Sequence, residues 1–189
     1  MASELKGLRV AFLTANEGVE QVELTAPWQA VSEAGGTPEL IAPESGDVQA
    51  FNHLDKADRF PVQRTLGDAD PTGYDAVVVP GGVANSDFLR MAPGAVSFIK
   101  RMFEAGKPAA VICHGPWLLV EADLVRGRTL TSWPSLQTDI RNAGGTWVDT
   151  QVQVCPADPN TLITSRKPDD LPAFCRTLTQ VFSRQGQPA

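Results

Sequence analysis

Short hydrophobic runs recur along the chain and alternate with segments whose hydrophobic residues lie three or four positions apart. Each run is hydrophobic at nearly every position and rich in β-branched residues. That pattern is typical of strands buried on both faces of a parallel sheet. Strands are predicted at residues 8–14, 37–43, 74–82, 108–113, 127–133, 146–155 and 160–165.

The intervening segments have the spacing of amphipathic helices. Gly35 and Gly36 end the first of them, and Pro27 within it separates a first turn from the main helix. Residues 44–73 are polar and rich in Gly, Asp and Pro, which predicts a loop with at most a short edge pair around Phe60–Leu66. Helices are predicted at residues 19–36, 92–107, 114–125, 134–145 and 168–184.

Strands that alternate with helices predict a single α/β domain with a doubly wound, mostly parallel sheet and helices on both faces. This domain is expected to span residues 8–184, with an N-terminal extension at 1–7 and a flexible tail at 185–189. In such sheets, ligand sites form at the carboxyl ends of the strands. The residues that follow each predicted strand are therefore the candidates for chemistry.

The composition excludes several classes of function. Of 189 residues, 42% are hydrophobic, which is enough for a full core without disulfide or metal support. The net charge is −6 and no basic stripe is present, so neither nucleic acid nor an anionic membrane is an expected partner. The N-terminus lacks a signal-peptide pattern. Three cysteines without a C-x-x-C motif predict no disulfide framework, no metal site and a reducing cytoplasm, and no cofactor motif is present.

A cysteine and a histidine stand side by side where predicted strand 108–113 ends. Cys113 lies just before Gly115 and Pro116, which begin the next predicted helix, so the thiol is expected on a sharp strand-to-helix turn. The helix dipole and free backbone N–H groups are expected to lower its pKa. Adjacent His114 is the candidate general base or ion-pair partner. A buried structural cysteine is the alternative interpretation.

Glycines end the neighbouring predicted strand. The sequence Pro80-Gly81-Gly82 permits positive φ angles and close backbone approach, which suits N–H groups that stabilise a developing oxyanion. A simple tight turn is the alternative. The oxyanion interpretation is favoured because Cys113 is predicted at the end of the next strand.

Acidic residues follow the first strand. Glu17, Glu20 and Glu23 are either solvated acids of a helix N-terminus, or one of them points toward Cys113 as a neutral acid. Spacing alone does not choose among the three. Asp87 is a further acid on the crevice side, with an N-cap or turn role as the alternative.

Five stretches together resemble the DJ-1/PfpI superfamily, most closely its PfpI branch of intracellular protease/amidase-like proteins related to class I glutamine amidotransferases. They are LTANEGVEQVEL, DAVVVPGGVANSDFLR, GKPAAVICHGPWLLVEADLVRGRTLTSWPS, RNAGGTWVD and LITSRKPDDLPAF. The likeness runs from about Leu8 to about Val181 and is weakest at 44–73. It implies a flavodoxin-like α/β/α sandwich that forms a homo-oligomer, a dimer or often a hexamer.

The resemblance also implies roles for individual residues. It matches the reactive cysteine to Cys113, the following histidine to His114, and the acid that hydrogen-bonds the cysteine to Glu20. The oxyanion hole would then be formed by the backbone N–H groups of Gly82 and His114. In the protease-like branch a carboxylate from a neighbouring subunit completes a Cys-His-acid triad, and Asp87 is the nearest match. The alternative for that position, one residue earlier, is Ser86.

Three functions are compatible with these residues. The first is a stress-response cysteine hydrolase in which Cys113 attacks a peptide or amide carbonyl and His114 carries the proton. The second is a cofactor-free glyoxalase or deglycase in which Cys113 adds to a small reactive carbonyl such as methylglyoxal and Glu20 moves protons. The third is a non-enzymatic redox stress sensor that works through oxidation of Cys113.

Overall fold

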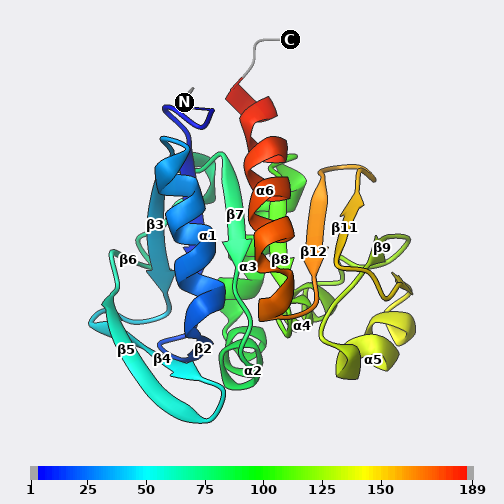
Figure 1. The fold of residues 1–189 in the computed structure, drawn as a ribbon, viewed down its shortest axis with the longest axis horizontal. Helices are drawn as coiled ribbons and strands as arrows, with labels where there is room; N and C mark the ends of the chain where they lie inside the picture. Colours follow the sequence, from blue (N-terminus) through cyan, green and yellow to red (C-terminus); the bar gives the residue numbers. More distant parts are fainter. Residues whose placement is uncertain (1–3, 187–189) are drawn as a thin grey trace.

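The computed structural model describes residues 4–186 and shows the predicted α/β/α sandwich (Figure 1). Its central sheet has seven strands in the order β11-β12-β8-β7-β1-β3-β6. All neighbouring pairs are parallel except β11–β12. The strands are β1 (Arg9–Leu13), β3 (Thr37–Ala42), β6 (Arg64–Thr65), β7 (Ala76–Val79), β8 (Ala109–Ile112), β11 (Val152–Cys155) and β12 (Leu162–Ser165).

Two small sheets flank the central one. One has the order β2-β4-β5 and the other pairs β10 with β9. Their strands are β2 (Glu17–Glu20), β4 (Asp47–Asn52), β5 (Asp55–Pro61), β9 (Thr129–Leu130) and β10 (Thr146–Trp147).

Helices cover both faces of the central sheet because alternate strand residues point to opposite sides. Val10 and Phe12 of β1 belong to a core with α1 and α6, whereas Ala11 and Leu13 belong to a core with α2, α3, α4 and α5. The helices are α1 (Gln21–Glu33), α2 (Val83–Met91), α3 (Pro93–Glu104), α4 (Pro116–Glu121), α5 (Gln137–Asn142) and α6 (Leu171–Phe182).

Some element predictions were wrong in detail. Residues 44–73 hold more structure than predicted. The short edge pair expected around Phe60–Leu66 is present as β6, but the β4–β5 hairpin was not expected, because its strands are mostly exposed or half-exposed and lack hydrophobic runs. The first predicted helix begins with strand β2, because Val19 packs in the core of the small sheet before α1 starts. Helix α2 was not predicted. It has only three buried residues, two of them polar.

The ends of the chain agree only in part with the predicted boundaries. Leu5, in the expected extension, is fully buried and its N–H donates to the carbonyl of Ala34 at 2.9 Å. Of the expected tail, Gln185 and Gly186 lie in a 3₁₀ turn and the remainder lies outside the described residues. None of the helices within residues 4–186 is long and apolar enough to cross a membrane.

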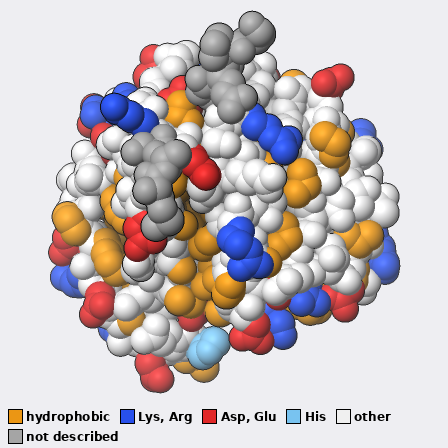
Figure 2. Space-filling view, turned by 45° about the horizontal axis from the view of Figure 1, so that its top comes forward, with side chains coloured by type: hydrophobic (Ala, Val, Ile, Leu, Met, Phe, Trp, Pro, Cys, Tyr) orange, Lys and Arg blue, Asp and Glu red, His pale blue; other side chains and the backbone are white. Residues whose placement is uncertain are grey.

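Charged side chains of both signs share the surface. On the face drawn in Figure 2, lysine and arginine side chains are interspersed with acidic ones, and hydrophobic side chains lie between them. This mixture agrees with the spread of charge along the sequence.

Candidate active site

The site forms at the carboxyl ends of β1, β7 and β8, where Cys113 follows β8 on a strained turn. Its φ of 62° is in the left-handed region, which costs a non-glycine residue about 1–2 kcal/mol. Two backbone hydrogen bonds hold this conformation. The Cys113 N–H donates to Ser165 O at 3.0 Å, and its carbonyl accepts from the Trp133 N–H at 2.9 Å. This is the predicted strand-to-helix elbow.

The carboxyl group beside the thiol belongs to Glu23, and the expectation that Glu20 fills this position is wrong. Glu23 is fully buried in the first turn of α1, and its Oε2 accepts from the Gly81 N–H at 2.9 Å, next to Cys113. Its Oε1 has no hydrogen-bond partner among residues 4–186. Glu20 ends β2 one residue before the helix, so its side chain has a different direction. Its carboxylate accepts from the backbone N–H of His53 at 3.1 Å.

Gly81 shows how closely these two groups pack. A Cβ atom at this position would lie 2.6 Å from Cβ of Cys113 and against Oε2 of Glu23. Contacts of that length do not occur between real atoms, so only glycine fits between the acid and the elbow. The structure thus explains the first glycine after β7 by a close approach of side chains.

Burial has the largest effect on the pKa values of Glu23 and Cys113. It raises the pKa of Glu23 from 4.5 to about 8, with a smaller opposing effect from the Cys113 thiol and the Gly81 N–H. Burial and the Glu23 charge also raise the pKa of the Cys113 thiol, against hydrogen bonds from the Gly82 and His114 N–H groups. The expected lowering of the thiol pKa is therefore wrong. The N–H groups act as predicted, but loss of water outweighs them.

The same two N–H groups are the predicted oxyanion donors. Both the Gly82 and the His114 N–H are directed at the Cys113 sulfur. Gly82 has a φ of 94°, and a Cβ there would clash with the carbonyl of Gly18. Its glycine therefore allows the first turn of α2 to approach both β2 and the thiol.

His114 lies against the thiol. Its Nδ1 is 3.2 Å from Sγ of Cys113, and its ring is stacked on Trp133 and edge-on to Trp117. Burial lowers the pKa of His114 from 6.5 to about 4, so its imidazole is neutral at physiological pH. A neutral ring next to a thiol can accept its proton.

The remaining predicted acids are placed differently. Asp87 is exposed on α2, whereas Ser86 is fully buried. No described residue of this chain gives a carboxylate hydrogen bond to the His114 ring; its one side-chain hydrogen bond is to Cys113. His53 lies in the turn between β4 and β5, and Glu17 is exposed at the start of β2.

A hollow of about 750 Å³ opens over the thiol. Its apolar lining residues include Phe51, Leu54, Phe88, Trp117 and Trp133, and its ionisable lining residues are Glu17, Glu20, Glu23, Asp87, His53, His114 and Cys113. Over the described part of the chain, no group of three or more His, Cys, Asp or Glu residues is arranged to hold a metal. The hollow is shaped for an organic group that reaches the sulfur.

Comparison with known proteins decides the family. The chain matches the DJ-1/PfpI family over residues 8–181. It belongs to the DJ-1/PfpI family. It is 38% identical over 175 residues to a deglycase of Pyrococcus horikoshii, covering 93% of this chain and 99% of that protein. It is 34% identical over 168 residues to a Bacillus subtilis protein named as a candidate cysteine protease, covering 89% and 94%.

Solved structures agree on the fold of this DJ-1/PfpI protein. A two-domain protein of Anabaena variabilis, with DJ-1/ThiJ/PfpI-like and ferritin-like domains, superposes with a TM-score of 0.82 and 32% identity. The alignment covers 95% of this chain and 48% of that one. The single domain described here thus corresponds to about half of the Anabaena chain.

Two contributors to the DJ-1/PfpI site went unnoticed in the sequence. The sequence pattern places Trp133 and Ser165 only within predicted strands. In the structure, the Trp133 N–H and the Ser165 carbonyl form hydrogen bonds with the carbonyl and the N–H of Cys113. The other two cysteines lie outside the hollow: Cys155 is buried in β11, and Cys175 is half-buried on α6.

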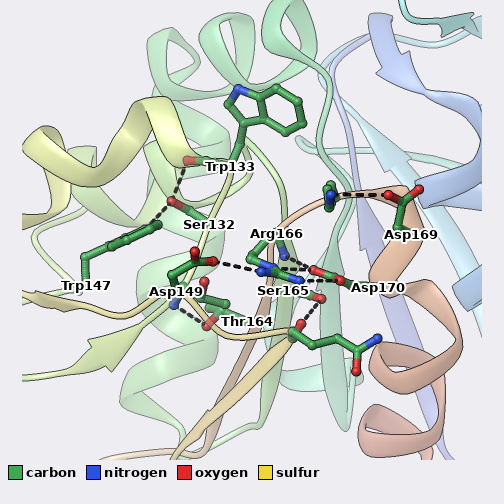
Figure 3. Close-up of polar contacts among 12 residues, drawn as sticks. Ser132, Trp133, Trp147, Asp149, Thr164, Ser165, Arg166, Asp169 and Asp170 are labelled. Carbon is green, nitrogen blue, oxygen red and sulfur yellow. Dashed lines mark hydrogen bonds and ion pairs between the residues drawn. The ribbon is translucent and has the colours of Figure 1, made fainter.

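Arg166, which follows Ser165 in the chain, forms ion pairs with two aspartates, as Figure 3 shows. Its guanidinium donates to both oxygens of Asp170, at 2.8 and 2.9 Å, and to Asp149 at 2.8 Å. Asp170 is buried, and these bonds raise the pKa of Arg166. The cluster fixes the chain between β12 and α6, where Pro168 lines the hollow.

Proposed function

We propose that this DJ-1/PfpI protein is a cysteine hydrolase of the PfpI type, with Cys113 as the nucleophile toward a peptide or amide carbonyl. One observation carries the proposal: the Cys113 sulfur lies below an open hollow with neutral His114 Nδ1 3.2 Å away and two N–H groups directed at it. A base and oxyanion donors around one sulfur are the parts that acyl transfer requires.

The steps follow from the protonation states. Because burial raises the pKa of Cys113, the thiol stays protonated until a carbonyl carbon arrives. His114 then takes the thiol proton as the S–C bond forms, and the N–H groups of Gly82 and His114 stabilise the oxyanion. His114 returns the proton to the departing amine, which leaves a thioester on Cys113. Water hydrolyses the thioester and releases the acid.

A carboxylate that orients His114 would come from a second subunit. Asp87 fits this role because it is exposed at the rim of the hollow, whereas buried Ser86 has no route to another chain. A homo-oligomer, a dimer or a larger ring, is part of the proposal. The apolar side chains of Val83, Phe88 and Met91 are exposed on the same helix and suit such a contact.

The test compares Asp87→Asn with Glu17→Gln, another exposed carboxylate at the hollow. We expect Asp87→Asn to lower hydrolysis of a fluorogenic peptide amide at least about a hundredfold, as loss of an orienting acid does in other triads. Alkylation of Cys113 by iodoacetamide should stay within about twofold of wild type. Glu17→Gln should keep full hydrolysis. Full activity of Asp87→Asn would refute the assigned triad.

Glyoxalase or deglycase chemistry is the second candidate, and Glu23 favours it. With a pKa of about 8, Glu23 can give and take a proton near neutral pH beside the sulfur. The Pyrococcus horikoshii relative is named a deglycase. Cys113 would add to the aldehyde of methylglyoxal, Glu23 would move the proton between the two carbons, and water would release lactate. Wild-type protein that forms no lactate would exclude this reaction.

A redox sensor needs an exposed thiolate, whereas Cys113 is buried and largely protonated in the free protein. Its side chain is only 6% exposed and burial raises its pKa. The catalytic proposals are better supported because they require the thiolate only while the substrate is bound.

A further inference from the structure

Trp133 contacts the reactive pair in two ways. Its backbone N–H donates to the carbonyl of Cys113 at 2.9 Å and so holds the left-handed elbow. Its ring stacks on that of His114, with centroids 5.8 Å apart and planes at 23°. A shift of Trp133 would therefore move both the elbow and the imidazole.

Packing alone does not fix Trp133, because its side chain is 38% exposed at the rim of the hollow. Two donors hold its carbonyl: the Leu136 N–H at 3.0 Å and the buried hydroxyl of Ser132. Ser132 Oγ donates to the carbonyl of Trp133 at 2.8 Å and accepts from Trp147 Nε1 at 3.0 Å. Figure 3 shows this chain, with the Trp133 ring directed away from the Arg166 cluster.

We propose that Ser132 is a positioning residue that fixes Trp133 and, through it, the carbonyl of Cys113 and the ring of His114. Ser132 is fully buried, and its hydroxyl both donates and accepts, which leaves it one orientation. Trp147 comes from β10, so the small β9–β10 sheet becomes the support of the reactive elbow. The site thus depends on a part of the fold outside the seven-stranded sheet.

The pKa of His114 shows whether Trp133 is held in place over its ring. Removal of water is what lowers its pKa to about 4, and the rings of Trp117 and Trp133 provide the cover. If Trp133 loosens, water reaches the imidazole and its pKa rises toward 6.5. The ionisable groups around it are the Cys113 thiol in contact, the hollow's Glu17, Glu20, Glu23, His53 and Asp87, and Arg90 over the Trp117 ring.

The experiment is an NMR titration of the His114 ring from pH 3 to 8, with His53→Gln to assign the two histidines. In Ser132→Ala we expect proton affinity at His114 to rise at least about tenfold. Trp147→Phe keeps the aromatic packing but removes the donor to Ser132, and should give about a threefold rise. The matched control is Thr131→Val, because the Thr131 hydroxyl is buried with no hydrogen-bond partner among residues 4–186.

Each possible result of the titration either supports or overturns the positioning role of Ser132. A raised His114 pKa in Ser132→Ala and Trp147→Phe, with none in Thr131→Val, supports the positioning role. A lower melting temperature with an unchanged His114 titration would reduce Ser132 to a structural residue and overturn the inference. If Ser132→Ala does not fold, the titration of Trp147→Phe decides alone.

The inference rests on the proposed pairing of Cys113 with His114, but its readout needs no turnover. An enzyme that fails to cleave amides can still show the predicted titration, and one that cleaves them can fail to show it. The two proposals are therefore tested separately.

Discussion

Replacement of Glu23 by glutamine should change the pH dependence of stability between pH 5 and 8. Burial raises the pKa of Glu23 from 4.5 to about 8 in the folded protein. The folded state thus holds a proton that the unfolded chain releases above pH 4.5. The stabilisation is complete below 4.5 and is lost as the pH rises through 8. At about 1.4 kcal/mol per pH unit, the loss approaches about 5 kcal/mol.

Glutamine does not ionise, so the Glu23→Gln variant should not lose this stability as the pH rises. We expect the two proteins to have similar free energies of unfolding at pH 5, and the variant to be more stable by several kcal/mol at pH 8. The measurement is urea denaturation at four pH values between 5 and 8. His114, whose lowered pKa acts in the opposite direction below pH 6.5, is common to both proteins and cancels. A constant difference between pH 5 and 8 would show that Glu23 is ionised throughout, and would refute a protonated acid beside Cys113.

Three further predictions concern the same region. Alkylation of Cys113 at pH 8.5 should be several-fold faster in Glu23→Gln, because the carboxylate charge raises the thiol pKa, and should be unchanged in Glu20→Gln; acceleration in Glu20→Gln but not in Glu23→Gln would show that Glu20 is the acid beside the thiol. Gly81→Ala should cost about 1–3 kcal/mol in urea denaturation and remove activity, whereas Gly67→Ala, with its nearest contact at 3.8 Å, should do neither. Arg166→Met should destabilise by about 2–3 kcal/mol, less than a fully buried pair because Arg166 is 24% exposed, and Asp170→Asn in the same chain should recover part of the loss; a loss that the double variant does not reduce would count against the ion pair.

The hydrophobic pattern was sufficient for the central sheet because its strands are buried on both faces. In β7, for example, three consecutive valines are fully buried, and such a run predicts a strand inside the sheet: Val77, Val78 and Val79. The β4–β5 hairpin was missed for the opposite reason, since it is mostly solvated and held by backbone pairing. A sequence pattern is therefore informative where burial makes a whole strand or one face of an element hydrophobic, and it is silent where both faces meet solvent.

The site was predictable only where its residues follow strands directly. Cys113, His114 and Gly82 do so. The choice between Glu20 and Glu23 depended on where β2 ends and α1 begins, and one turn of helix separates a side chain beside the sulfur from one at the rim. Trp133 and Ser165 hold Cys113 through backbone groups, which every residue possesses, so no sequence pattern indicates them.

The buried, protonated Cys113 has a consequence for inhibitor design. A general thiol reagent meets a residue that is 6% exposed and a sulfur that carries its proton, so reactivity alone gives slow labelling. A weak electrophile attached to a flat apolar group gains affinity from Trp117 and Trp133 before any bond forms. Once its carbonyl or nitrile carbon lies over the sulfur, His114 can remove the thiol proton. Covalent probes for this protein should therefore be optimised first for fit to the hollow and only then for electrophilicity.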